Sequence, residues 1–363
     1  MARQTHQNIY FLSIALLLVG AFFAHASVGM AQSRAYAGPG PYPVSMSTVS
    51  DQGLLLTPSD PSHSKKTWPA LAFGHGLCGP TDRYSDTLKR ISSWGFVIIA
   101  NQKQEDCGEA MSPEHPVAAM KNFFSMPFKL GSALDYGAMT KNVTANVEYL
   151  LTREDVDSNA IALMGHSMGG GIIFDAAANL EESRPGVIKA LVALAPWNGV
   201  SPRPSSVVSK VTAPILIFCS MSDGLCPCSG EVTITDTQGL VTGPASMGIP
   251  MLFGPESDST WHGGAMAIFD NASNATLIDV SGVNHFTIAG TDDGTQMQEL
   301  AEYANGISGL NFNQPERPYR NIPTLEYTVA FLNVALDLNR TQGETKMREA
   351  SSDPRLAQVE GSR

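Results

Sequence analysis

The chain has few basic residues and no cluster of them. Only 23 of its 363 residues are Lys or Arg, against 34 Asp or Glu, and the formal net charge at pH 7 is −11. Nucleic acids and anionic membrane surfaces are bound through patches of basic side chains. The sequence therefore argues against both as partners and fits an ordinary acidic surface.

Long hydrophobic runs are also lacking, apart from one near the N-terminus. The apolar residues 9–23 follow Arg3 and His6 and precede Ala-His-Ala at 24–26. This order of basic, apolar and small residues is typical of a secretory signal peptide. A membrane anchor is the alternative, but the run is shorter than the roughly 20 residues that a spanning helix needs. We expect residues 1–26 to be a signal peptide and the protein to be secreted, with no stable membrane insertion after cleavage.

Cysteine is scarce, and its odd count leaves at least one thiol unpaired. The five are Cys78, Cys107, Cys219, Cys226 and Cys228. Secretion permits disulfides, and Cys78 and Cys107 each follow one of two predicted neighbouring strands, so we expect them to be bridged. Cys226 and Cys228 are too close in sequence for an easy mutual bridge, and nothing nearby completes a zinc set. The sequence therefore predicts no metal site.

Strand-like and helix-like segments alternate along the middle of the chain. The predicted strands are 70–73, 96–100, 160–164, 190–195, 215–219 and 275–280, and the predicted helices include 84–94, 133–151 and 327–338. Such alternation indicates a mostly parallel sheet with helices on both faces.

We expect one domain, residues 44–340, with insertions at about 101–132 and 224–274 that are too long to be plain connections. Residues 27–43, rich in Gly and Pro, predict a flexible lead-in. The charged residues 341–363 have no apolar period and predict a disordered tail.

The most informative segment is Ile-Ala-Leu-Met-Gly-His-Ser-Met-Gly-Gly-Gly at 161–171. An apolar run that breaks into G-x-S-x-G is typical of a nucleophile elbow, where a strand turns sharply into a helix and presents a Ser hydroxyl. A Cβ at the flanking Gly165 or Gly169 would collide with neighbouring backbone. The pattern makes Ser167 the candidate nucleophile.

A Ser hydroxyl needs a base and an orienting acid, in the chain order Ser, acid, His for this type of elbow. His285 follows the predicted strand 275–280 through a short turn, whereas the alternative, His262, follows no strand. Asp223 lies four residues beyond the strand 215–219, although an Asp before Gly is also a common turn residue. We expect His285 to be the base and Asp223 the acid.

An oxyanion hole needs two backbone N–H donors. The residue after the nucleophile, Met168, is one candidate, and Leu77 in the glycine-rich loop after the strand 70–73 is the other. His75 in the same loop is expected to brace the loop by hydrogen bonding rather than to act in catalysis.

These residues resemble those of the α/β-hydrolase superfamily, in the branch of bacterial polyester hydrolases and cutinase-like enzymes, chlorophyllases and platelet-activating-factor acetylhydrolases. The resemblance rests on 165–171, Ala-Pro-Trp at 195–197, 213–223 and 281–285. It implies the α/β-hydrolase fold, with Ser167, Asp223 and His285 as catalytic residues and Trp197 lining the acyl pocket. Ordinary core packing is the alternative role for Trp197.

The two insertions depart from the polyester hydrolase pattern where substrates are selected. Residues 111–130 are rich in Phe and Met, and we expect Phe124 among them to contact a lipophilic substrate. The function expected is a secreted serine hydrolase of carboxylic esters, small or polymeric, that needs no cofactor. A phospholipid acylhydrolase or lipase, a peptidase and a catalytically inactive binding module are the alternatives; the oligomeric state stays open.

Overall fold

The computed structural model describes residues 35–49, 53–64, 67–76, 81–101, 136–198, 205–221, 223, 226, 228–229, 231–236, 239–244, 264–290 and 323–362. The strands are β1 (Val44–Val49), β2 (Gly53–Pro58), β3 (Trp68–Gly74), β4 (Val97–Ala100), β5 (Val156–His166), β6 (Ile188–Leu194), β7 (Ile215–Cys219), β8 (Glu231–Asp236), β9 (Gly239–Pro244), β10 (Ala275–Val280) and β11 (Leu356–Gly361). The α-helices are α2 (Ser85–Ser92), α5 (Tyr136–Leu151), α6 (Met168–Ser183), α7 (Ser205–Val208), α8 (Gly264–Asn271), α10 (Thr324–Ala335) and α11 (Arg340–Glu349), with short 3₁₀ helices η1 (Thr81–Tyr84), η5 (Thr287–Ala289) and η7 (Ala350–Ser352).

A nine-stranded sheet forms the centre of the described molecule, in the order β1-β2-β4-β3-β5-β6-β7-β10-β11. Within this order, the central strands run parallel to one another, namely β4, β3, β5, β6, β7 and β10. Antiparallel strands extend both ends, β1 and β2 on one side and β11 on the other. This is the expected α/β-hydrolase fold with its mostly parallel sheet.

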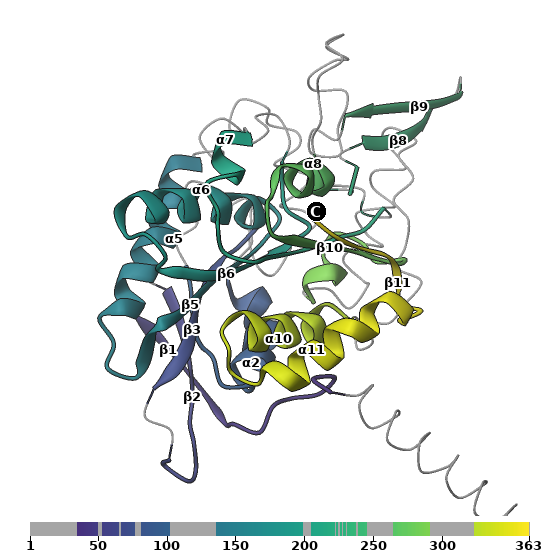
Figure 1. The fold of residues 1–363 in the computed structure, drawn as a ribbon. Coiled ribbons are helices and arrows are strands. Elements are labelled where there is room, and N and C mark those ends of the chain that lie inside the picture. The colour runs from purple at the N-terminus through teal and green to yellow at the C-terminus, as the bar shows by residue number, and fades with distance from the viewer. Residues whose placement is uncertain are drawn as a thin grey trace, which may run out of the picture.

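Helices cover both faces of this sheet (Figure 1). The helices α2, α10 and α11 lie on one face, and α5, α6, α7 and α8 lie on the other. The central strands are accordingly continuous apolar runs: every residue of β3, β4 and β7 is buried. Because neighbouring parallel strands end at the same edge, the loops after β3, β5, β7 and β10 share one end of the sheet.

The predicted strands 215–219 and 275–280 coincide with β7 and β10. The predicted elbow strand 160–164 lies within the buried part of a longer β5, in which residues 157–159 are exposed or partly exposed. The hairpin of β1 and β2 was not predicted, because β1 is largely exposed and carries a weak apolar pattern. β2 is its apolar partner, and most of β2 is buried.

The expected flexible lead-in is wrong for residues 35–43. Tyr36 is buried and packs edge-on against Trp94, with 4.9 Å between the ring centroids. The backbone N–H of Gly40 donates to Ser93 Oγ at 2.7 Å, and Arg90 donates to the carbonyl of Ala37. An aromatic anchor thus orders a segment whose Gly and Pro content suggests flexibility. Residues 27–34 lie outside the described residues.

The expected disordered tail is also wrong, since residues 340–362 form α11, η7 and β11, which pairs antiparallel with β10. Two of the charged side chains pair with a buried carboxylate. Lys346, which is 2% exposed, lies 3.1 Å from Glu326 on α10. Arg355 donates two hydrogen bonds to Glu326, at 2.8 and 2.9 Å. Because ion pairs replace apolar packing here, the segment lacks the hydrophobic period that predicts order.

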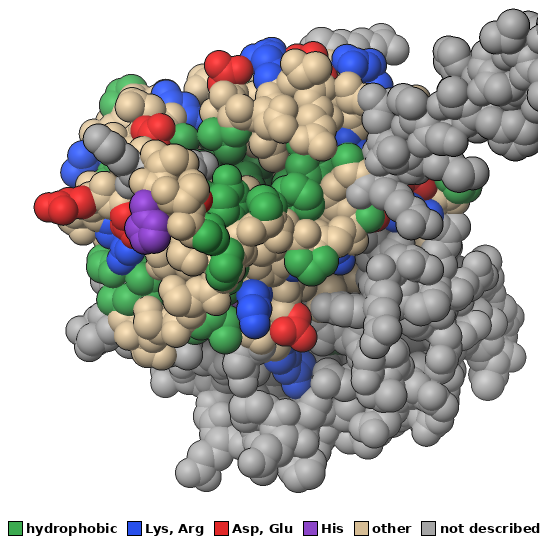
Figure 2. Space-filling view, turned by 90° about the horizontal axis from the view of Figure 1, so that it is seen from below, with side chains coloured by type: hydrophobic (Ala, Val, Ile, Leu, Met, Phe, Trp, Pro, Cys, Tyr) green, Lys and Arg blue, Asp and Glu red, His purple; other side chains and the backbone are tan. Residues whose placement is uncertain are grey.

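Of the two predicted insertions, 102–132 lies outside the described residues. The other, 224–274, contains the antiparallel β8–β9 hairpin and α8 in its described parts. In the face shown in Figure 2, Lys and Arg side chains stand singly among Asp and Glu, and hydrophobic side chains gather toward its middle. Within the described ranges, no helix is long and apolar enough to cross a bilayer.

Candidate active site

Ser167 sits at the sharp turn between β5 and α6, in a strained backbone conformation. Its φ of 57° and ψ of −124° are rarely adopted by residues other than glycine. Neighbouring backbone holds it there: the Ser167 N–H donates to Leu194 at 2.9 Å, and the Trp197 N–H donates to the Ser167 carbonyl at 2.7 Å. The predicted strand-to-helix elbow is therefore present.

The glycines that flank the elbow are required by close backbone contacts, as predicted. A Cβ on Gly165 would lie 2.4 Å from the carbonyl oxygen of Gly169. A Cβ on Gly169 would lie 2.2 Å from the carbonyl oxygen of Gly74, at the end of β3. Side chains at these positions would push α6 away from the strands β3 and β5.

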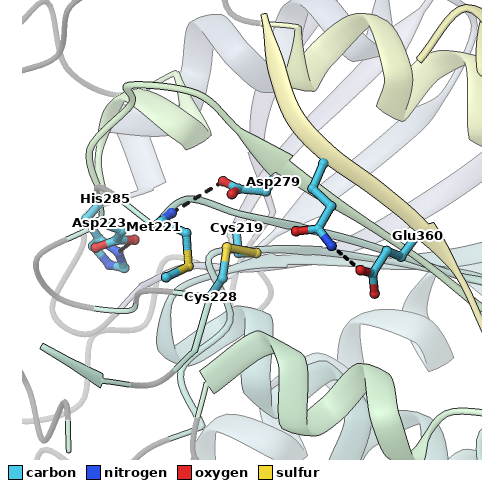
Figure 3. Close-up of a disulfide and its surroundings, with 8 residues drawn as sticks. Cys219, Met221, Asp223, Cys228, Asp279, His285 and Glu360 are labelled. Carbon is cyan, nitrogen blue, oxygen red and sulfur yellow. Dashed lines mark hydrogen bonds and ion pairs between the residues drawn. A yellow bond between two sulfur atoms is a disulfide. The ribbon is translucent and has the colours of Figure 1, made fainter. Parts of the chain in front are cut away.

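Asp223 and His285 are joined by a hydrogen bond of 2.8 Å between Asp223 Oδ2 and His285 Nδ1. Asp223 follows β7 and His285 follows β10, and these two strands are parallel neighbours. Both side chains are almost fully buried, at 0% and 4% exposure. The other carboxylate oxygen accepts the backbone N–H of Cys226 at 2.9 Å. The structure thus brings together the predicted acid and base; Figure 3 shows them side by side.

The loop that carries His285 is braced by a residue that sequence reasoning missed. Asn284 Oδ1 accepts the backbone N–H groups of Phe286 and Thr287, at 3.0 and 2.8 Å. Such side-chain turns are a regular use of Asn, and the Asn-x-x-Thr sequence was the available signal. The brace fixes the backbone on both sides of His285.

Two contacts link the elbow of Ser167 to the loops of the predicted acid and base. His166 Nε2 lies 2.8 Å from the carbonyl oxygen of His285. The Cys226 thiol makes a hydrogen bond with Ser167, while burial and the Asp223 charge raise its pKa well above the ordinary value. The Cys226 thiol is therefore protonated, and Cys226 links the carboxylate of Asp223 to the elbow through its backbone N–H and its thiol.

Part of the expected oxyanion hole falls within the described residues. Met168 is the first residue of α6, and the N–H groups of a first helical turn have no intrahelical acceptor. Leu77 lies outside the described residues, but Gly76 before it approaches the elbow, since a Cβ there would lie 3.2 Å from Ser167 Cβ. His75 Nδ1 pairs with the Gly76 carbonyl at 2.8 Å, which confirms its expected bracing of the loop.

Of the two expected substrate contacts, Trp197 lies within the described part of the chain. Trp197 is 6% exposed and belongs to the hydrophobic core, so most of its ring area serves packing. Its backbone N–H contacts the elbow, as given above, but a role in an acyl pocket stays a prediction. Phe124 and the alternative base His262 lie outside the described residues.

The structure contains a disulfide that the sequence did not predict, between Cys219 and Cys228, whose Cα atoms are 5.1 Å apart. It closes the loop that carries Asp223 (Figure 3). Asp279 on β10 adds a hydrogen bond of 3.3 Å from the backbone N–H of Met221 in the same loop. The expected partners Cys78 and Cys107 lie outside the described residues.

Comparison with known proteins identifies relatives. The model of a family described as "PETase: PET hydrolase-like" matches residues 31–234. Cutinase est1 of Thermobifida alba is 28% identical over 165 residues, 46% of this chain and 46% of its own. Cutinase 1 of Thermobifida cellulosilytica is 28% identical over 198 residues, 53% of this chain and 63% of its own. Platelet-activating factor acetylhydrolase of Cavia porcellus is 23% identical over 190 residues, 45% of this chain and 42% of its own. The chain spans about half the length of the relatives it matches.

Proposed function

Because this chain belongs to the PET hydrolase-like family, we propose that it is a secreted serine hydrolase that cleaves carboxylic esters through an acyl-enzyme. Secretion is supported by the signal-peptide pattern of residues 1–26. Ser167 is the proposed nucleophile, His285 the base and Asp223 the orienting acid. The chemistry needs no cofactor, since all groups come from side chains and backbone.

The proposed mechanism follows from the placement of these groups. His285 Nδ1–H donates to Asp223, which leaves Nε2 as the basic nitrogen. His285 Nε2 takes the proton of Ser167 Oγ as this oxygen attacks the ester carbonyl carbon. The N–H groups of Met168 and Leu77 would stabilise the oxyanion. The C–O bond then breaks, the alcohol leaves with the proton from His285, and water repeats the sequence on the acyl-enzyme.

The observation that carries the proposal is the buried 2.8 Å hydrogen bond between Asp223 and His285 beside a strained elbow serine. A buried carboxylate that contacts an imidazole costs desolvation, and a strained serine costs conformational energy. A binding module with no catalytic step has no need of either. The arrangement therefore favours a working hydrolase over an inactive binding module.

For the substrate, we propose a lipophilic or polyester-like ester. Two of the relatives reported above are named as cutinases, which supports a polymeric ester. A phospholipid acylhydrolase is the second candidate, supported by the match to the platelet-activating factor acetylhydrolase. The insertions 101–132 and 224–274 follow β4 and β7, two parallel strands that end at the same edge of the sheet, and we propose that they distinguish the two substrates.

A panel of p-nitrophenyl esters of rising acyl length, with a phospholipid and a polyester film, tests this function. The control is Ser167→Ala, which should be inactive on every substrate. Each methylene in an apolar acyl pocket should add about 0.8 kcal/mol, or roughly fourfold in kcat/KM, until the pocket is full. A steady fall from acetyl upward would favour an acetyl-selective enzyme instead, and activity in Ser167→Ala would contradict the proposal.

A further inference from the structure

Tyr84 and His166 connect two loops of the candidate site by hydrogen bonds. Tyr84, at the end of η1, accepts the backbone N–H of Gly76 at 3.1 Å. Its hydroxyl lies 2.9 Å from His166 Nδ1, and His166 Nε2 lies 2.8 Å from the carbonyl oxygen of His285. Tyr84, His166 and His285 are all buried. The chain of contacts runs from the glycine-rich loop, through the elbow, to the loop of the base.

One arrangement of protons satisfies every contact in this chain. The His285 carbonyl can only accept, so His166 must carry its proton on Nε2 and donate it. Neutral His166 then has Nδ1 as an acceptor, and the Tyr84 hydroxyl donates to it. The Tyr84 oxygen remains free to accept from Gly76. The hydrogen bonds therefore run in a single direction, from Gly76 to His285.

The electrostatics of the two side chains agree with this arrangement. Burial, and the nearby His285, hold the pKa of His166 well below its usual 6.5, so the ring is neutral. Burial raises the pKa of Tyr84 to about 12, so the hydroxyl keeps its proton. The His166 and His285 rings also contact each other, with 4.6 Å between their centroids and 39° between their planes. A proton on His166 Nδ1 would remove the acceptor for Tyr84.

We propose that Tyr84 and His166 are positioning residues. They set the distance between the glycine-rich loop that contains Gly76 and the loop that carries His285, and so the arrangement of both loops around Ser167. The proposal rests on the proposed function, because Gly76 precedes the expected donor Leu77 and His285 is the expected base. The three contacts join residues 8, 82 and 119 positions apart in the chain. Neither side chain would touch the substrate; each would act through the backbone it holds.

Kinetics of Tyr84→Phe test the proposal. This variant removes the hydroxyl and keeps the ring, whose centroid lies 4.9 Å from that of Phe73. We expect kcat to fall about 10- to 100-fold with KM changed less than threefold, since misplacement of catalytic groups affects the transition state most. The matched control is Tyr149→Phe on α5, whose hydroxyl bonds Arg153 at 3.2 Å, and which should leave kcat unchanged.

His166 offers a graded test by rescue. Gln can both donate to the His285 carbonyl and accept from Tyr84, whereas Leu can do neither. We therefore expect kcat in the order wild type, His166→Gln, His166→Leu, with KM nearly constant. Equal kcat for the Gln and Leu variants, or full kcat in Tyr84→Phe, would overturn the proposal.

A measurement without activity separates this proposal from the proposed function. Long-range ¹H–¹⁵N spectra of the wild-type protein report histidine tautomers, and the signals lost in His166→Gln identify His166. We expect the neutral Nε2–H form. An Nδ1–H form would overturn the proposed chain of hydrogen bonds from Gly76 to His285, even if the enzyme is active. An inactive wild-type protein with the Nε2–H form would contradict the proposed function but support the chain of hydrogen bonds.

Discussion

Cys219 and Cys228 are joined by a disulfide that encloses Asp223 within a nine-residue separation. Figure 3 shows this bridge beside the carboxylate and His285. The loop of Asp223 is thus closed covalently at the end of β7, while the hydrogen bond from Met221 to Asp279 ties it to the neighbouring strand. The position of Asp223 depends on this loop more than on any regular secondary structure.

Removal of this disulfide should lower both stability and activity. A bridge over a loop of this size typically contributes about 2–3 kcal/mol. We expect the Cys219→Ser/Cys228→Ser double variant to lose roughly that much free energy of unfolding in urea denaturation, and to lose activity as Asp223 becomes less well held. Reductant should lower the activity of the wild-type protein by a larger factor than that of the double variant, which has no such bridge to lose. Equal sensitivity of the two proteins would show that the reductant acts elsewhere.

The proposed base should be far more important than the alternative histidine. His285→Ala removes the proton acceptor, and we expect kcat to fall on the order of 10⁴-fold. His262→Ala, measured under the same conditions, should cost much less, because only the base lies in the path of the proton. A larger loss in His262→Ala would show that the base has been wrongly chosen.

Neutral His166 should make the folded protein sensitive to acid. Its pKa in the folded state lies below 6.5, the value expected on unfolding, so below pH 6.5 the unfolded chain binds more protons. The free energy of unfolding therefore falls as the pH drops, by up to about 1.4 kcal/mol per pH unit for this group. Urea denaturation between pH 7 and 5 should show a shallower fall in His166→Gln. Identical slopes in the two proteins would contradict a neutral buried His166.

The C-terminal ion pairs should stabilise the fold, because Glu326 is buried against Lys346 and Arg355. Glu326→Ala would leave a buried ammonium group with one fewer partner, and we expect a loss of about 3 kcal/mol or more in thermal or urea unfolding. The matched control is Glu344→Ala, whose pair with Arg340 is exposed and should cost under about 0.5 kcal/mol. Similar losses in both variants would refute this account of the tail.

Much of the fold could be predicted because buried parallel strands are apolar runs. The same reasoning placed Ser167, Asp223 and His285, since each follows such a run at an edge where parallel strands end. It failed where order comes from a few specific contacts rather than from an apolar pattern. Tyr36 anchors the lead-in by packing against Trp94, and the ion pairs of Glu326 with Lys346 and Arg355 help to order the tail.

Contacts across long sequence separations were also beyond prediction. The spacing of Cys219 and Cys228 gave no reason to prefer their pairing over others, and only the folded loop brings them together. Tyr84 has no pattern that points to His166, which lies 82 positions away. His166 itself occupies the variable position of G-x-S-x-G, where the pattern gives no role.

The central claim is that Ser167 is a nucleophile activated by His285, and covalent labelling tests it most directly. A fluorophosphonate probe should add one adduct to the wild-type protein, and peptide mass mapping should place it on Ser167. Labelling should be absent in Ser167→Ala and strongly slowed in His285→Ala, while Tyr149→Phe should label at the wild-type rate. An adduct on another residue, or undiminished labelling of Ser167→Ala, would contradict the account.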